Sequence, residues 1–554
     1  MKKIKIKDIY LILVIVVGLI VISLYSTYAL FTSEEITTNT AVNMSVGFSY
    51  GYATNEVEIL TIKAKESKEI SVSISNTSSS SINYNLYYEL VSGDEASLEA
   101  GYTSNTENPT NGVLDASSSK RVMLGFINNS DSDITVKIGF TTDSIVSPRK
   151  ELNNEVILNK NLDTSGANAP SLADGMIPIM WNGTNWVKAD VTNQDENYRW
   201  YNYDEKQWAN AVMVNATSRD NYMNADEGTT ITEDDVLAYY VWIPRYKYQL
   251  FNVNSEKMDP ILIDVQFESK TTAKSTGSSN GEYLTHPAFT FGTTELDGIW
   301  VGKFETTGSA TTPTIKPNVT SLTSQNVSTK FTTGQKFGTS NYLTTTGVSQ
   351  VDAHMMKNTE WGAVAYLKQS KYGLGLTDIA LNSNDSNDSY LSDSYLTGCG
   401  PQSAGSTSYG STCNAYNTDL GKSASTTGNI TGIYDMSGGA KEDVMGVMKT
   451  SDGTALFYSN SGFTTSTLPF NSKYVDQYEY DQTEYNAIRI LGDATGETKG
   501  WYSDYFEFPY IGAPWFERGG YASDASLAGV FCAYGVDGSA DTSISFRSVL
   551  ALGA

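Results

Sequence analysis

The sequence predicts an exported chain with three parts: an N-terminal membrane-spanning helix, a β-sandwich, and a larger domain of short strands and long loops. Three observations support this fold class. Lysines precede an apolar N-terminal run, a Ser-, Thr- and Asn-rich region with period-two alternation follows, and all nine tryptophans lie at or beyond Trp181. A composition change that sharp indicates two separate folding units after the N-terminal segment.

Length and charge set the broad class. A chain of 554 residues with 40% hydrophobic content is long enough for about two to four folded domains. Its net charge of −25 has the wrong sign for a nucleic-acid-binding protein, whose affinity depends on Lys and Arg contacts with phosphates. We therefore expect no nucleic-acid partner. The acidic surface is typical of a soluble exported protein, and cation binding is the alternative.

Residues 1–31 carry the targeting signal. Four lysines within the first seven residues precede an apolar run over residues 9–22, which continues with small polar breaks to Phe31. A basic segment before such a run is typical of a secretory signal, and the whole stretch is long enough to span a bilayer. We favour an uncleaved single-pass anchor in the cell membrane, with the remaining domains extracellular. Cleavage at Ala29, which would give a secreted protein, is the alternative.

Residues 32–147 predict a β-sandwich of immunoglobulin-like size. Short alternating segments at 69–74, 84–90, 120–126 and 133–140 are bounded by Ser, Asn and Gly clusters. The region contains no cluster of His, Cys or paired carboxylates. We therefore favour a stalk that separates the next domain from the membrane, and an adhesion or filament module is the alternative.

The polar stretch 148–172 is interrupted by proline and glycine, which indicates a linker. Residues 173–554 form the aromatic-rich domain. One helix is expected from His354 to Lys371, where apolar residues repeat at helical spacing. A final strand is expected from Ile544 to Leu550.

Five motifs of this domain follow one another in a fixed order. They are HPAFTFGTTELDGIWVGKFETTG (286–308), TEWGAVAYL (359–367), GIYDMSGGAKEDVMG (432–446), ERGG (517–520) and SFRSVL (545–550). In this order they resemble the formylglycine-generating-enzyme (sulfatase-modifying factor) superfamily, and the resemblance implies an α+β C-type-lectin-like fold with many loops for residues 173–554. The sequence departs from the family at GGAKED, where only the acid, Glu442, is retained from the family's Asn-Val-Trp-Glu-Trp.

The glycines and arginines of these motifs are expected to be structural. The glycines fit positions where the backbone adopts a positive φ or closely approaches another segment. The arginines are expected to tie loops together by donating several hydrogen bonds to carbonyls or carboxylates. These residues are Gly438, Gly439, Gly519, Gly520, Arg518 and Arg547.

The resemblance raises the question of catalysis. Oxidases of this superfamily bind copper through two cysteines that follow the Arg-Gly-Gly segment, and the matching positions here are Asp524 and Gly529. Cys532 is the only cysteine nearby, and one thiolate cannot supply the pair. The iron-dependent sulfoxide synthases need a histidine cluster, whereas this chain has only His286 and His354. We expect no enzyme activity and no resident cofactor; a residual oxidase is the alternative.

The cysteines and one polar run have simpler interpretations. Cys399 and Cys413 flank a Gly- and Ser-rich loop, so a disulfide is expected in an exported protein. Cys532 lies in an apolar run and is expected to be buried. The run from Asn382 to Ser394 lacks the Gly and Glu of an EF-hand, so no metal ligands are assigned. A loop calcium site built from other oxygens is the alternative.

The last loops are the predicted binding site. The resemblance extends to catalytically silent relatives, the tropism-determining and retroelement-diversified proteins, which display a variable ligand surface there. By that resemblance the ligand-binding candidates are Trp515, Phe516, Tyr521, Ser523, Asp524, Tyr534, Asp537 and Asp541. Exposed aromatics with short polar partners suit a glycan or a protein surface. Core packing is the alternative for Trp515, Phe516 and Tyr534.

Together these expectations describe an adhesin-like protein of the cell surface. Its non-catalytic C-terminal domain would bind an extracellular glycan or protein, and its N-terminal helix would lie in the membrane. Two other functions stay open. One is the residual oxidase, and the other is a structural filament subunit in which the sandwich polymerises.

Overall fold

The computed structural model divides the chain into two compact units, Met1–Lys160 and Asn161–Ala554. The predicted membrane anchor, residues 1–31, lies outside the described residues. Among those that are described, no helix is long and apolar enough to cross a membrane. The structure describes residues 44–50, 58–64, 67–103, 110–130, 132–154, 156, 163–193, 198–385, 394–450, 459–464, 466–469, 473–479 and 490–553.

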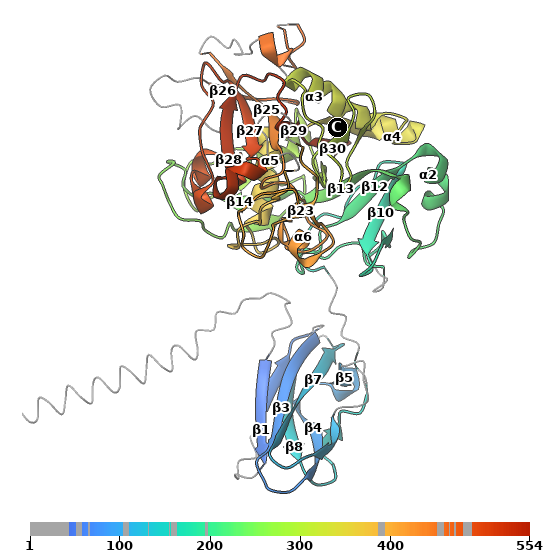
Figure 1. The fold of residues 1–554 in the computed structure, drawn as a ribbon. Coiled ribbons are helices and arrows are strands. Elements are labelled where there is room, and N and C mark those ends of the chain that lie inside the picture. The colour runs from blue at the N-terminus through green and yellow to red at the C-terminus, as the bar shows by residue number, and fades with distance from the viewer. Residues whose placement is uncertain are drawn as a thin grey trace, which may run out of the picture. The chain divides into compact units, whose positions relative to one another are not determined.

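Two sheets make up the described part of the first unit (Figure 1). One has the strand order β1 (Met44–Tyr50), β3 (Ser67–Asn76), β7 (Ser118–Asn128) and β5 (Leu98–Tyr102). The other has the order β2 (Glu58–Ile62), β8 (Ile134–Thr141), β4 (Ile82–Ser92) and β6 (Asn111–Leu114), and β9 (Arg149–Glu151) also pairs with β4.

Alternating apolar residues join these two sheets. In β3, Ile70, Val72 and Ile74 are at most 1% exposed, because every second side chain of a strand points to the same face. The inward residues of both sheets form one hydrophobic core, which also contains Leu152. The packing of this unit therefore extends past residue 147, where the predicted sandwich ends.

A seven-stranded antiparallel sheet is the largest of the second unit. Several of its strands are almost completely buried, β12 and β13 among them, and a strand buried on both faces needs a nearly continuous apolar run. The strand order is β11 (Trp186–Lys188), β10 (Met176–Trp181), β12 (Asn210–Val214), β13 (Val236–Pro244), β19 (Gly298–Gly302), β30 (Ser548–Leu552) and β22 (Val351–Met355).

A second large sheet has the order β26 (Asp476–Glu479), β25 (Lys441–Lys449), β27 (Trp515–Gly519) and β28 (Gly529–Val536), and β29 (Ile544–Phe546) pairs with β25. The predicted final strand is therefore divided between two sheets. β29 joins this sheet, whereas β30 joins the seven-stranded one, and Arg547 is the residue between them.

Short ladders and helices complete the second unit. The ladders are β14 (Tyr246–Gln249) with β15 (Val265–Phe267) and β16 (Tyr283–Thr285), β17 (Thr290–Phe291) with β18 (Thr294–Glu295), β20 (Thr307–Gly308) with β21 (Pro313–Thr314), and β23 (Cys399–Gly400) with β24 (Asn414–Ala415). The helices are α2 (Ala216–Met223), α3 (Val327–Gly334), α4 (Thr345–Gln350), α5 (Asn358–Lys368) and α6 (Asp419–Ser423).

This architecture corrects the predicted fold class. The described residues are mostly β-strands with few helices, so the α+β C-type-lectin-like assignment is wrong. The longest described helix, α5, has eleven residues. The physical reason is that most apolar segments of this unit are short and bounded by turn residues, which favours strands over helices.

The predicted helix from His354 to Lys371 is also shorter than expected. His354 belongs to strand β22, where it pairs with the C-terminal strand β30. The helix begins at Asn358, because the Glu360 carboxylate accepts a hydrogen bond from the Lys357 backbone N–H at 2.8 Å and closes the first turn.

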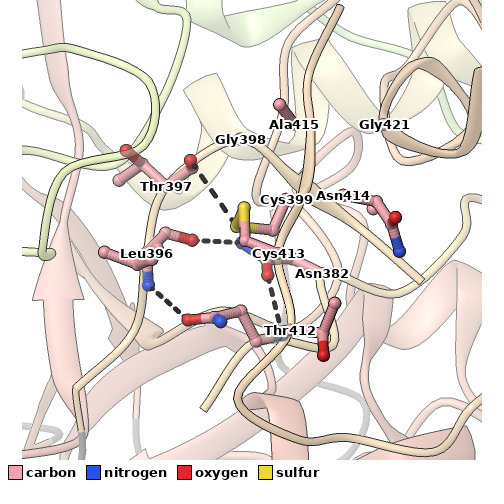
Figure 2. The surroundings of a disulfide bond; sticks show 12 residues. Asn382, Leu396, Thr397, Gly398, Cys399, Thr412, Cys413, Asn414, Ala415 and Gly421 are labelled. Atoms are coloured by element: carbon pink, nitrogen blue, oxygen red, sulfur yellow. Dashed lines mark hydrogen bonds between the residues drawn. A yellow bond between two sulfur atoms is a disulfide. The ribbon is translucent and has the colours of Figure 1, made fainter. Parts of the chain in front are cut away.

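Cys399 and Cys413 form a disulfide, and their Cα atoms are 5.0 Å apart. Figure 2 shows the bond beside the backbone of residues 396–398. The disulfide closes the loop that connects β23 to β24. These two strands pair with each other, with Cys399 opposite Ala415. Cys532 is a buried free thiol.

The four glycines expected to be structural have φ angles between 68° and 83°: Gly438, Gly439, Gly519 and Gly520. A Cβ at Gly520 would lie 2.7 Å from the Ala528 Cα, so a larger residue does not fit there. Arg518 is fully buried and donates hydrogen bonds to the carbonyls of residues 493 and 494, at 3.2 and 2.8 Å.

Arg547 connects the two large sheets. Its Nε donates to the Glu442 carboxylate on β25 at 3.1 Å, and its Nη2 donates to the other carboxylate oxygen. Nη1 donates to the Gly302 carbonyl at the end of β19 (2.8 Å), and Nη2 also donates to the Tyr434 carbonyl (3.0 Å). Both side chains of the pair are fully buried. Burial raises the pKa of Glu442 and Arg547 lowers it, which leaves that pKa at about 7.

We expect Arg547→Ala to lower the free energy of unfolding of the second unit by about 3–5 kcal/mol, because it leaves a buried carboxylate unpaired. All nine tryptophans belong to this unit, so tryptophan fluorescence of the full chain in urea measures its unfolding alone. Lys270→Ala is the control. It removes an ion pair with Asp297 whose side chains are 52% and 35% exposed, and it should cost less than about 1 kcal/mol. Equal losses in the two variants would contradict the role of Arg547.

Candidate functional site

Trp515 and Phe516 are core residues of β27. Both are fully buried, and β27 lies between β25 and β28. Trp515 stacks on Phe463 with ring centroids 5.6 Å apart, and Phe516 packs against Tyr478 at 4.7 Å. The prediction that these two residues contact a ligand is therefore wrong, because both faces of an internal strand are covered here.

Three more of the predicted binding residues, Ser523, Asp537 and Asp541, lie in short turns of the chain. Ser523 lies half-buried in η8 (Ala522–Leu527), a short 3₁₀ segment. The Asp537 carboxylate accepts a hydrogen bond from the Ser539 N–H at 3.0 Å, and Asp541 accepts one from the Ser543 N–H at 2.7 Å. Both aspartates therefore shape turns.

The remaining predicted residues, Tyr521, Asp524 and Tyr534, come together around Lys441. The Lys441 Nζ lies 4.7 Å from the centroid of the Tyr521 ring and 4.5 Å from that of Tyr534. The Tyr534 hydroxyl donates to Asp524 at 3.3 Å. Tyr505 stacks on Tyr534, with centroids 4.5 Å apart. One cation is therefore held between two tyrosine rings, and a third ring extends the cluster.

This cluster is the candidate site, and we call it the tyrosine–lysine patch. Its exposed members include Tyr505 (37%) and Leu527 (45%), which lie side by side because the Tyr505 N–H donates to the Leu527 carbonyl. The patch consists of Lys441, Tyr505, Tyr521, Asp524, Leu527 and Tyr534.

Sequence reasoning missed Lys441, Tyr505 and Leu527. The sequence holds a signal for Lys441 and one for Tyr505, but none for Leu527. Lys441 is the one basic residue in the GGAKED segment that departs from the family pattern, and Tyr505 lies in the aromatic run at residues 501–510. Neither signal indicates that the two segments meet.

Three strands and one turn position the patch. Lys441 is the first residue of β25, and Tyr534 on β28 pairs with Glu517 on β27. Asp524 holds η8 in place, since its carboxylate accepts a hydrogen bond from the Tyr521 N–H at 3.2 Å. Asp524 therefore has a structural role as well as a position in the patch.

A buried carboxylate lies beneath the patch. Glu517 is fully buried, and among the described residues its oxygens have no hydrogen-bond partner, although Lys441 forms an ion pair with it at 3.5 Å. Burial raises the pKa of Glu517 and Lys441 lowers it, which leaves a pKa of about 7. Burial lowers the pKa of Lys441, but Glu517, Asp524 and Tyr521 together with Cys532 raise it above the ordinary value. Lys441 therefore keeps its charge against the tyrosine rings.

The cysteine and the histidines do not form a reactive site. Burial raises the pKa of Cys532, which keeps it a thiol at neutral pH. Burial lowers the pKa of His286 to about 3, and its Nε2 is hydrogen-bonded to the Gly492 carbonyl at 2.8 Å. Burial lowers the pKa of His354 as well, but Glu360 at 3.0 Å raises it to about 9. The described part of the chain contains no group of three or more His, Cys, Asp or Glu that could hold a metal ion.

The two positions that match the oxidase cysteines differ in their surroundings. Asp524 belongs to the patch, whereas Gly529 begins β28. A Cβ at Gly529 would lie 2.1 Å from the Asp504 carboxylate, so no side chain fits there without movement of Asp504. A cysteine pair could not be introduced at these positions without rearranging that carboxylate.

Part of the polar run considered for calcium, residues 386–393, lies outside the described residues. The described Asn382 and Asn384 are buried and hold neighbouring loops together. Asn382 donates to the Leu396 carbonyl at 3.0 Å, beside the disulfide (Figure 2), and Asn384 donates to the Ser411 carbonyl at 3.2 Å.

Comparison with known proteins assigns no family: neither a family model nor a curated protein matches the chain. The resemblance to the formylglycine-generating-enzyme superfamily therefore stays a prediction.

Glu517 should make stability depend on pH. Its folded pKa of about 7 lies above the ordinary 4.5, so its protonation favours the folded state. That stabilisation is complete below about pH 4.5 and is lost as the pH rises through 7. We expect the free energy of unfolding of Glu517→Gln to exceed that of the unsubstituted chain by an amount that grows between pH 4.5 and 8, by up to about 3 kcal/mol.

Urea unfolding followed by tryptophan fluorescence at several pH values measures this difference. Glu479→Gln is the control, since Glu479 is 72% exposed beside Lys449, and its difference should stay flat. A pH-independent difference for Glu517→Gln would show that Glu517 titrates normally.

Proposed function

We propose that the second unit binds an extracellular protein partner through the tyrosine–lysine patch, and that it acts by binding rather than by catalysis. The observation that carries the proposal is the cluster in which Lys441 lies between the Tyr521 and Tyr534 rings and the exposed Tyr505 ring stacks on Tyr534. Tyrosines bring a large contact area at a low cost in conformational entropy.

The surroundings of the patch favour a protein over a glycan. Leu527 within the patch is 45% exposed, and Tyr510 and Ile511 in the neighbouring loop are 43% and 42% exposed. Tyrosines are enriched at protein interfaces, and the buried centre of such an interface is more apolar than its rim. A glycan would leave the exposed aliphatic side chains without a matching apolar surface.

The net charge of the chain and its disulfide restrict the class of partner further. The chain has a net charge of −25, which favours encounter with a basic surface. The disulfide between Cys399 and Cys413 is typical of proteins in an oxidising environment. Both features support a partner outside the cell with a basic contact surface.

The Cys532 thiol and both histidines are buried, which supports a binding role over the residual oxidase. Asp524 and Gly529 occupy the positions at which the oxidase resemblance requires cysteines, and the site has no second thiol to share a soft metal. Incubating the chain with copper and a cysteine-containing substrate peptide tests this, and formylglycine above background would favour the oxidase.

We expect Tyr505→Ser to weaken partner binding at least about tenfold, because Tyr505 is an exposed ring that no hydrogen bond of the core requires. The chain is first screened against arrays of immobilised extracellular proteins and glycans, and the affinity of each hit is then measured by biolayer interferometry. Tyr409→Ser is the matched control, since Tyr409 is 42% exposed and lies outside the patch.

Equal affinities of Tyr505→Ser and Tyr409→Ser for every hit would contradict the assignment of the patch. Hits confined to the glycan array, with loss of binding in Tyr505→Ser, would keep the patch as the site and replace the protein partner with a glycan.

A further inference from the structure

Apart from the tyrosine–lysine patch, the second unit has a hollow with a volume of about 190 Å³. It lies between the β10–β11 hairpin, the segment 199–208 and residues 429–431. No residue of the tyrosine–lysine patch lines it. It is therefore a separate candidate site, and it does not depend on the proposed function.

Arg199 brings a buried positive charge to this hollow. Its side chain is 6% exposed, and within the described part of the chain its Nε and Nη1 have no hydrogen-bond partner. The other four described buried arginines each donate several hydrogen bonds to carbonyls or side-chain oxygens, as Arg547 does. A buried charge is unfavourable unless it is paired, so these two nitrogens, which have no acceptor among the described residues, suit an acceptor that a ligand supplies.

A buried lysine shows what Arg199 lacks. The Lys303 Nζ donates to the Asn210 side chain (2.8 Å) and to the carbonyls of Ile430 (2.6 Å) and Gly432 (2.9 Å). Burial also lowers the pKa of Lys303. An arginine keeps its proton at any physiological pH, and its planar fork matches a carboxylate. Arg199 therefore favours an anionic ligand.

We propose that this hollow binds the ring of an acidic sugar, a hexuronic acid, with the carboxylate on Arg199 and the ring at Trp181, the least buried of the tryptophans that line it. Trp181, Trp200 and Trp208 line the walls. Two of these rings are held in place, since the Trp200 Nε1 donates to the Asn210 carbonyl (2.7 Å) and the Trp208 Nε1 to the Tyr372 carbonyl (2.8 Å).

Size and charge select this ligand class. A hollow of about 190 Å³ is smaller than the roughly 300–1,000 Å³ of pockets for drug-sized ligands, so it fits one ring. Glu205 and Gln207 are exposed at the rim. The Glu205 carboxylate disfavours multiply charged phosphates and sulfates, whereas it can accept hydrogen bonds from sugar hydroxyls. A sugar ring with one carboxylate can pair that carboxylate with Arg199 and donate hydrogen bonds from its hydroxyls to Glu205.

Methyl glucuronide titrated into the full chain tests the proposal, with tryptophan fluorescence and calorimetry as readouts. We expect saturable binding with a Kd on the order of 1 mM, as for a single small ring, and no saturable binding of the neutral methyl glucoside. Arg199→Met should weaken glucuronide binding at least tenfold. Arg149→Met, which makes the same change of charge in the first unit, should not.

The stability of Arg199→Met separates binding from a structural role. Because the substitution removes an unpaired buried charge, its urea midpoint should equal or exceed that of the unsubstituted chain. A lower midpoint would overturn the proposal by showing that Arg199 has a structural partner. Absence of saturable glucuronide binding, equal binding of the two sugars, or unchanged glucuronide binding in Arg199→Met would each overturn it as well.

Discussion

A fully buried arginine–glutamate pair connects the two large sheets of the second unit, and the candidate site depends on it. Arg547 separates two consecutive strands that join different sheets, and its guanidinium binds Glu442 on β25. Successive side chains of a strand point to opposite faces. Glu442 points toward Arg547, so its neighbours Lys441 and Asp443 point to the opposite face of β25. Glu517 lies on that face, within ion-pair distance of Lys441. The position of the patch lysine therefore follows from a contact that connects the two sheets.

The parts of the fold that were predictable depend on local patterns. The strands of the first unit could be predicted because the apolar residues of β3, Ile70, Val72 and Ile74, alternate within a short stretch of sequence. The helix at α5 could be predicted in type but not in extent. His354 fits the helical spacing, yet it pairs with β30, almost 200 residues later, and no local pattern reports such a pairing. The division of the last strand at Arg547 is another long-range effect, because both halves are apolar and read as one strand.

The candidate site shows the same limit. The resemblance to the retroelement-diversified proteins grouped Trp515 and Phe516 with Tyr521 and Tyr534, but strand pairing buries the first two and leaves the tyrosines near the surface. Lys441 reaches those tyrosines because β25 pairs with β27, and a sequence pattern does not specify which strands are neighbours. The walls of the second hollow come from three separate segments, near residues 180, 200 and 430. Tryptophan content alone indicated a folded core there and did not indicate a hollow.

The buried cations of the second unit differ in how their charge is compensated, and this difference separates structural sites from binding sites. Lys330 is fully buried and pairs with Asp443 at 2.6 Å, and Arg547 pairs with Glu442. Lys303 has three oxygen acceptors, and burial lowers its pKa. Each of these arrangements is complete within the protein, so a ligand could add little to it. Arg199 lines the hollow, and its Nε and Nη1 have no hydrogen-bond partner among the described residues. A buried arginine with two donor nitrogens unpaired among the described residues is therefore the strongest reason to look for an anionic ligand in that hollow.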